Sequence, residues 1–291
     1  MNRKIKILFI LILVLLVISI ILNISFFVNK QQTKTTKENN SSETKNNKAS
    51  SKLGCSRITR LDNEPQYDRA LSLIQQRLKE HNKTYKSKDN PYYYKYFSPE
   101  LVNCIKIIEA TPKKRDDFEG YFILNSEEIK PDYYPIIVNS KYVESDDIGI
   151  VLLLSHELTH VQQYINAVNN KKETSCLDSE ANAFMATRMF YIFGLNFQET
   201  GMVDERIKTL KSLSNNKGTG MVGYYENYMY TSFDTPFTMI DLVQKLVGES
   251  KCSTMENIEK GLVSSCLDSD VHNKLKEIIK NDSYYKKQCR L

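Results

Sequence analysis

The segment His156-Glu157-Leu158-Thr159-His160 constrains this chain more than any other part of its sequence. It lies in an apolar run from Ile148 to Ile165, in which Glu157 is the only charged residue. Such a run predicts a buried helix, and on a helix His156 and His160 would project from one face, about one turn apart. Two imidazoles in that arrangement suit a single zinc ion.

Glu157 would lie roughly 100° around the same helix from His156. From there its carboxylate could take a proton from water at the metal, so Glu157 is the predicted catalytic residue, acting as general base. The alternative is a chance match on an exposed helix. Only four histidines occur in the chain and two of them are here. Unpaired polar groups in an apolar helix would also be costly, which favours the zinc interpretation.

A catalytic zinc site needs a third ligand from the protein. A histidine six residues after His160 is excluded, because that residue is Asn166. The segment from Asp178 to Phe193 predicts a second buried helix, on which Glu180 lies near the start. A buried carboxylate needs a cation as its partner, so Glu180 is the predicted third metal ligand.

Alternatives remain at this stage for the third ligand and for the helix caps. Glu180 could be a helix N-terminal residue stabilised by the helix dipole, and Asp178 and Glu173 are the next candidate ligands. Candidate N-caps are Asp146 or Asp147 for the first helix, and Asp178 or Ser179 for the second.

The His156-Glu157-x-x-His160 motif, followed by Glu180 in a Ser-Glu-Ala context, resembles the gluzincin group of zinc metallopeptidases, to which thermolysin belongs. The resemblance covers about residues 118–195. It implies a zincin-like fold with His156, His160 and Glu180 as zinc ligands and Glu157 as general base. The chain departs from thermolysin-like enzymes at Phe184, where they have an aspartate. A carboxylate that orients a zinc-bound histidine is therefore not expected from that position.

The resemblance also implies a substrate strand and an oxyanion donor. In gluzincins an edge strand before the zinc helix binds the peptide through backbone hydrogen bonds, and the segment from Ile136 to Asn139 has the matching place. Its alternative is a plain hairpin that supports the core. Gluzincins commonly use a tyrosine or histidine as the donor. The sequence singles out no donor. A tyrosine cluster could line the cleft, and His272, which we expect at the surface, is a further candidate. The cluster consists of Tyr224, Tyr225, Tyr228 and Tyr230.

Residues 1–30 predict an N-terminal membrane anchor. Residues 7–29 carry no charge, and as a helix they would extend about 34 Å, enough to cross a hydrocarbon core of about 30 Å. A cleaved signal peptide is the alternative, but the first alanine is Ala49 and the apolar run is long. Residues 31–54 are polar and contain no aromatic residue, which is typical of a disordered linker.

The cysteines and the basic N-terminus predict the orientation in the membrane. Arg3, Lys4 and Lys6 favour a cytoplasmic N-terminus, although lysines also follow the anchor. All six cysteines lie after the anchor, which is typical of disulfides in an oxidising compartment. Among the possible pairs, Cys252 with Cys266 is a plausible local closure, and reduced thiols in a cytosolic domain are the alternative. The net charge of +5 suits anionic lipid, and no nucleic-acid signature occurs.

Residues 55–291 predict one α+β domain, mostly helical, with a small sheet before the zinc helix. Its catalytic core would span about 118–195, and 200–291 would be a helical C-terminal part. Short strands are expected at 118–124 and 135–138. Besides the two zinc-site helices, the expected helices are 67–79, 98–110, 204–213, 235–248 and 268–280, and 214–223 is an expected loop.

The predicted function is hydrolysis of a peptide or protein substrate by a membrane-anchored, extracytoplasmic zinc metallopeptidase. One alternative is a zinc-binding protein without peptidase activity, which binds its partner uncleaved. Another is a metal-free, membrane-tethered interaction domain stabilised by disulfides. The sequence does not indicate an oligomeric state.

Overall fold

The computed structural model divides the chain into two units, Met1–Asn46 and Asn47–Leu291, and all described residues lie in the second. The predicted anchor at 1–30 and linker at 31–54 therefore lie outside the described residues. No described helix combines the length and the apolar character needed to cross a bilayer. The structure describes residues 55, 61–86, 93–111, 118–123, 132–140, 142, 146–170, 174–215, 236–254, 256–257 and 263–291.

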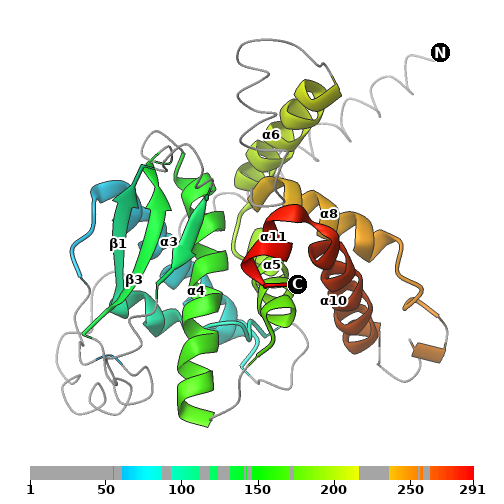
Figure 1. The fold of residues 1–291 in the computed structure, drawn as a ribbon, viewed down its shortest axis with the longest axis horizontal. Helices are drawn as coiled ribbons and strands as arrows, with labels where there is room; N and C mark the ends of the chain where they lie inside the picture. The colour runs from blue at the N-terminus through cyan, green and yellow to red at the C-terminus, as the bar shows by residue number, and fades with distance from the viewer. Residues whose placement is uncertain are drawn as a thin grey trace, which may run out of the picture. The chain divides into compact units, whose positions relative to one another are not determined.

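The described residues form a mostly helical α+β structure with one small sheet, as the sequence predicts (Figure 1). The elements are α3 (Pro65–Thr84), η1 (Pro99–Cys104), β1 (Ile105–Ala110), β2 (Gly120–Phe122), β3 (Tyr134–Asn139), α4 (Asp147–Asn170), α5 (Cys176–Phe193), α6 (Phe197–Asn215), α8 (Pro236–Gly248), α10 (Val263–Asn281) and α11 (Ser283–Gln288).

The sheet has the order β1-β3-β2, with β3 in the middle. β1 pairs parallel to β3, and β2 pairs antiparallel to it, with Gly120 opposite Val138. The expectation that 136–139 forms the edge strand is therefore wrong, because β1 covers the side of β3 that β2 leaves open. β2 is the strand at the edge of the sheet that lies nearest to α4.

The predicted helix at 98–110 is also wrong from Ile105 onward, and its first part is a 3₁₀ helix. Ser98 accepts a hydrogen bond from the Glu100 amide and begins η1, but the chain changes to strand at Ile105. Ile105 and Ile107 are buried on either side of the half-exposed Lys106. Alternating burial of β-branched side chains fits a strand better than a helix.

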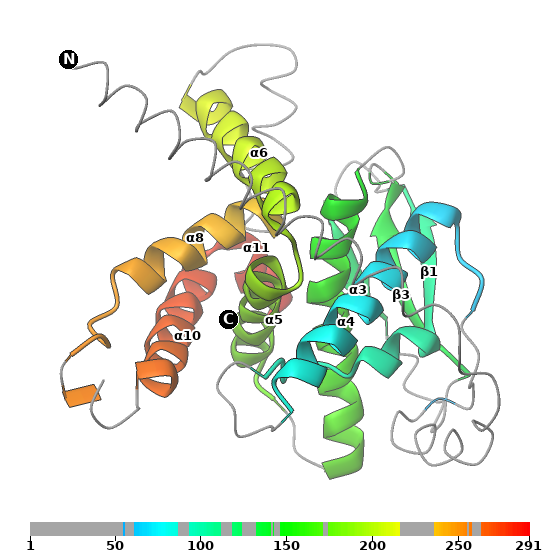
Figure 2. The ribbon, with the colours of Figure 1, turned by 180° about the vertical axis from the view of Figure 1, so that it is seen from behind.

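α4 lies between the sheet and α5 in both ribbon views (Figures 1 and 2). It is buried along most of its first fifteen residues, and Asp146 caps it by accepting a hydrogen bond from the Gly149 amide at 2.6 Å. α5 begins earlier than predicted, because Ser175 is its N-cap and accepts from the Asp178 amide. The predicted caps Asp178 and Ser179 thus lie within the helix.

The C-terminal part is helical, as predicted, and packs on the far side of α5. Its apolar cluster joins α5 to α8, α10 and α11, and contains Ala181, Phe184, Met185, Met239, Val243, Leu246, Val271, Leu275, Ile279 and Tyr285. α6 and α10 are longer than predicted, and the sequence did not predict α11. The expected loop lies outside the described residues beyond Asn215.

All six cysteines are paired. The local Cys252–Cys266 pair is confirmed. Cys55–Cys104 and Cys176–Cys289 join segments 49 and 113 residues apart. The long-range pairs therefore fix the start of β1 and the C-terminal helix α11 to distant parts of the chain.

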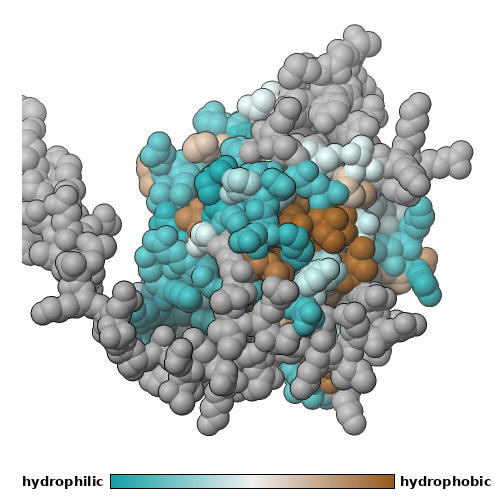
Figure 3. All heavy atoms as spheres, turned by 90° about the vertical axis from the view of Figure 1, so that its left-hand side faces the viewer, coloured by the Kyte–Doolittle hydropathy of each residue, from teal (hydrophilic) through white to brown (hydrophobic). Residues whose placement is uncertain are grey.

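The side of the molecule that carries the sheet has a largely polar surface interrupted by apolar patches (Figure 3). Exposed apolar side chains of the sheet include Ile108 on β1 and Tyr121 on β2, each about two-fifths exposed. The sheet thus buries one face against the helices and keeps part of the other exposed.

Candidate metal centre

α4 places the two histidines of the motif as the sequence predicts. His156 and His160 lie on one face with ring centroids 4.8 Å apart. Their Nε2 atoms are 3.1 Å from each other, and His156 is only 9% exposed. The apolar residues around the motif bury the helix, so both nitrogens point into the protein rather than into bulk water.

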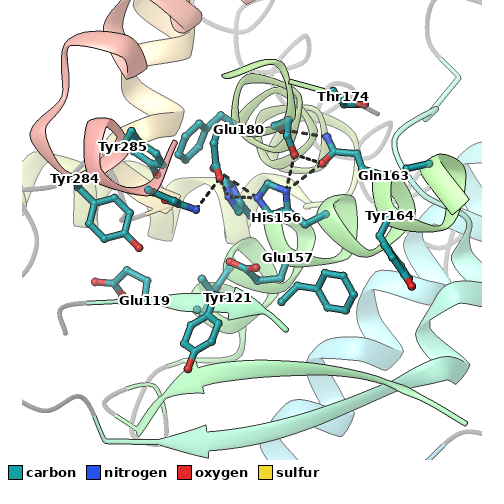
Figure 4. A pocket seen from close by; sticks show the side chains of 18 residues that line it. Glu119, Tyr121, His156, Glu157, Gln163, Tyr164, Thr174, Glu180, Tyr284 and Tyr285 are labelled. Carbon is teal, nitrogen blue, oxygen red and sulfur yellow. Dashed lines mark hydrogen bonds and ion pairs between the residues drawn. The ribbon is translucent and has the colours of Figure 1, made fainter. Parts of the chain in front are cut away.

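α5 brings Glu180 to the same point (Figure 4). Its Oε2 atom lies 3.4 Å from Nε2 of His156 and 3.5 Å from Nε2 of His160. Glu180 is 4% exposed. These separations exceed the usual range for a hydrogen bond to an imidazole nitrogen.

The three ligand atoms fit a shared metal ion. They form a triangle with sides of 3.1, 3.4 and 3.5 Å. Ligands on a tetrahedral ion with bonds near 2.0–2.1 Å are about 3.3 Å apart, so one point can lie at bonding distance from all three. Within the described part of the chain, His156, His160 and Glu180 are the group that could hold a metal ion.

The charges of the three groups are coupled. Burial lowers the pKa of His156. Burial also acts to lower the pKa of His160, but the Glu180 carboxylate, together with Glu157 and Gln163, outweighs burial and raises that pKa to about 9. The two imidazoles hold the pKa of Glu180 far below its usual value, against the effect of burial. A proton on His160 would therefore compete with a cation for the same place between the ligands.

A second layer of polar groups orients His160. Its Nδ1 atom lies 3.0 Å from Oε1 of Gln163 and 3.1 Å from Oγ of Ser179, and Gln163 donates to the Ser179 carbonyl at 3.0 Å. Sequence reasoning missed this role for both residues. Their positions in the sequence could have suggested this role, because Gln163 is one turn after His160 and Ser179 directly precedes Glu180. Phe184, at the position that departs from thermolysin, packs its ring 4.5 Å from the His156 ring.

Glu157 lies beside the metal site in a cavity of about 390 Å³. It is 3% exposed, and Figure 4 shows it between His156 and Tyr121 of β2. Gly120 on β2 leaves room for its carboxylate, because a Cβ atom there would be 3.3 Å from Glu157 Oε1. Residues of β2, α4, α5 and α11 line the cavity. A carboxylate, a potential metal site and a strand edge thus share one space.

α11 supplies the wall of the cavity that sequence reasoning missed. Tyr284, Tyr285 and Gln288 line it, and Gln288 Nε2 donates to Glu180 Oε1 at 3.0 Å. No local pattern could have found this contact, because 108 residues separate its partners.

The alternative ligands do not join the cluster. Asp178 pairs instead with Lys276 at 2.7 Å and approaches His272 at 3.9 Å. The hydrogen bond from Lys276 lowers its pKa. His272 on α10 is not part of the candidate metal cluster, and about a fifth of its side chain is exposed. Glu173 and the cluster of Tyr224, Tyr225, Tyr228 and Tyr230 lie outside the described residues.

Compared with protein-family models, with curated proteins and with solved structures, the chain gives no match.

Proposed function

We propose that this chain is a zinc metallopeptidase. The observation that carries the proposal is the convergence of three ligand atoms, His156 Nε2, His160 Nε2 and Glu180 Oε2, within 3.5 Å of one another next to the buried carboxylate of Glu157. Two imidazoles and one carboxylate are a ligand set typical of catalytic zinc, and they leave a fourth position open. The structure thus supports the reading of the sequence motif as gluzincin-like.

The role of each residue in the proposed reaction follows from its chemistry. Zinc held by the three residues would lower the pKa of water to about 7 and polarise the scissile carbonyl. Glu157 takes the proton from the attacking water and delivers it to the leaving amine nitrogen. Gln163 and Ser179 hold the His160 ring in the orientation that points Nε2 toward the metal.

The peptide substrate binds along β2 rather than along β3. β2 lies at the edge of the sheet and its residues Gly120, Tyr121 and Phe122 line the cavity. An extended peptide can add to such an edge through backbone hydrogen bonds. This places the scissile bond beside α4, from which Glu157 and both histidines project.

The proposed setting is the outer face of a membrane, with residues 1–30 as anchor and 31–54 as linker. Three disulfides support an oxidising compartment for the domain. Together with the uncharged run at 7–29, they favour a single-pass protein with a cytoplasmic N-terminus.

Comparison of the wild-type chain with Glu157→Gln tests the proposal. Both proteins are expected to purify with one equivalent of zinc, because Glu157 is not a ligand. Hydrolysis of a broad peptide library should fall roughly 10²- to 10⁴-fold in the variant, because the general base is lost. Glu205→Gln, on the exposed face of α6, is the matched control and should keep full activity. Full turnover by Glu157→Gln would reject the assignment.

A zinc-binding protein without peptidase activity is the second candidate. Phe184 packs against His156 where thermolysin-like enzymes have a carboxylate, so the metal environment differs from theirs. Stoichiometric zinc with no turnover of any library peptide by the wild-type chain would favour this candidate. Absence of zinc from the purified protein would instead favour a metal-free interaction domain.

A further inference from the structure

α11 closes one side of the cavity but has no part in the chemistry proposed above. Its contact with the metal site is the hydrogen bond from Gln288 Nε2 to Glu180 Oε1 at 3.0 Å. The other oxygen of this carboxylate, Oε2, faces the two imidazoles. Each oxygen of Glu180 thus has a different partner, and only one partner comes from the C-terminal helix.

The hydrogen bond from Gln288 restricts how the Glu180 carboxylate can turn. Glu180 is 4% exposed, whereas Gln288 is exposed and lines the cavity, so the Gln288 amide covers Oε1 on the cavity side. A buried acceptor without a donor is costly, and the carboxylate would rotate to reduce that cost. With the amide in place, Oε2 stays directed at the point between the imidazoles. Partners of this kind, one layer behind a ligand, tune metal affinity.

The Cys176–Cys289 disulfide holds α11 at the same place. Cys289 directly follows Gln288, and Cys176 is four residues before Glu180 on α5. Residues four apart on a helix share a face, one turn from each other. The covalent link and the hydrogen bond therefore join the same stretch of α11 to the same face of α5.

α11 is too short to hold its position by itself. It has six residues, capped at its start by Asp282, which accepts from the amides of Tyr284 and Tyr285. An isolated helix of this length is not stable in water. Besides the Gln288 hydrogen bond, its attachments include the disulfide and the buried Tyr285 ring, which lies 5.9 Å from Phe184.

We propose that Gln288 is a positioning residue that aims Glu180 at the metal, and that the Cys176–Cys289 disulfide keeps Gln288 in place. This inference rests on the metal site of the proposed function. In this proposal α11 controls metal affinity through the Gln288–Glu180 hydrogen bond, which requires the folded chain with its Cys176–Cys289 disulfide.

The first test is Gln288→Met in the full chain, which keeps the side-chain length but removes the donor. Zn²⁺ affinity, measured by competition with a chromophoric chelator, should fall about 10- to 100-fold. The visible absorption of the Co²⁺-loaded variant should also change, because the carboxylate ligand is reoriented. Lys287→Met, on the exposed surface of the same helix turn, is the matched control and should change neither. Unchanged affinity and spectrum in Gln288→Met would overturn the proposal.

A double-mutant cycle tests the part played by the disulfide. Gln288→Met is combined with Cys176→Ser/Cys289→Ser, or with Cys252→Ser/Cys266→Ser as the matched control pair. Removing the first disulfide should weaken Zn²⁺ binding, and Gln288→Met should then add little, because the contact is already lost. In the control background Gln288→Met should keep its full effect. A full effect in both backgrounds would show that the disulfide does not hold Gln288.

The wild-type measurement separates this inference from the proposed function. A wild-type chain that binds no Zn²⁺ would sink both. A wild-type chain that binds Zn²⁺ as tightly as Gln288→Met would overturn only the role of Gln288, and would leave the three-ligand site intact.

Discussion

At the scale of single residues, the site is built from groups whose charges depend on one another. His156 and His160 share one helix face, and the Glu180 carboxylate beside them acts to raise the pKa of His160. Burial makes each of these charges costly without its partners. The three residues therefore form one unit, and replacing one of them changes the charge state of the other two.

Zinc affinity should rise with pH between 7 and 9. In the metal-free fold the pKa of His160 is about 9, above its ordinary 6.5, so zinc must displace a proton at pH 7. The gain should approach tenfold per pH unit and level off above about pH 9. Chelator competition at pH 7, 8 and 9 measures the affinity, and calorimetry in two buffers measures the released proton. An affinity independent of pH would contradict the His160–Glu180 pair.

Zinc affinity should rise with pH, but the stability that the His160–Glu180 pair gives to the metal-free fold should fall. Because the folded pKa of His160 is raised, its contribution to stability is fully present below pH 6.5 and is lost as pH rises through about 9. Both effects come from the same proton on His160, because its loss frees the zinc ligand and also removes the ion pair that stabilises the metal-free fold.

At the scale of secondary structure, β2 decides how the cavity is shaped. This three-residue strand borders α4, and Gly120 lies where its neighbours are close on three sides. A Cβ atom at Gly120 would be 3.3 Å from Glu157 Oε1, from the Ile137 carbonyl oxygen and from Leu153 Cδ1. The strand can therefore approach α4 this closely only with glycine at position 120, or after a shift of the neighbouring groups.

Gly120→Val should lower turnover with little change in zinc affinity. The added methyl groups would displace the Glu157 carboxylate, and a misplacement of about 1 Å can cost roughly 100-fold in rate. His156, His160 and Glu180 are not among the three nearest groups to a Cβ atom at Gly120, so zinc binding should change little. Zinc titration and kcat on one library-derived peptide measure the two effects.

Gly201→Ala is the control for this variant. Gly201 is an exposed helical glycine on α6 with open space around its Cβ position. Alanine there should raise helix stability by up to about 1 kcal/mol and leave kcat unchanged. Equal kcat for Gly120→Val and the wild-type chain would argue against β2 as the strand beside the reacting bond.

At the scale of the whole molecule, the disulfides differ in what they constrain. Cys176–Cys289 closes a separation of 113 residues and Cys252–Cys266 one of 14. In the chain-entropy description, a longer closed loop removes more freedom from the unfolded chain. The long-range bond should thus stabilise the fold more than the local one.

Replacing Cys176 and Cys289 by serine should cost about 2 kcal/mol more than replacing Cys252 and Cys266. Urea unfolding of both double variants, followed by circular dichroism, gives the two free energies of unfolding. The metal should be removed from all samples, so that differences in zinc affinity do not enter. An equal or larger loss in the Cys252/Cys266 variant would contradict the loop-length argument.

Local patterns in the sequence predicted those features of this protein that depend only on residues close together in the chain. An apolar run with one motif predicted α4 and the two histidines, and a second apolar run predicted α5 and Glu180. The α+β class, the helical C-terminal part and the Cys252–Cys266 pair were also predictable. Helical periodicity alone fixes which side chains share a face, so these features needed no knowledge of the fold.

Only the tertiary structure decided which distant segments meet. It showed that β3 is central and β2 is the edge strand, because strand order depends on pairings that the chain order does not encode. It brought Gln288 to Glu180 across 108 residues and joined Cys176 to Cys289. Such contacts arise from packing and long-range pairing, for which residues close in sequence carry no signal. The sequence by itself determined the candidate ligands, and the fold determined which distant residues surround them.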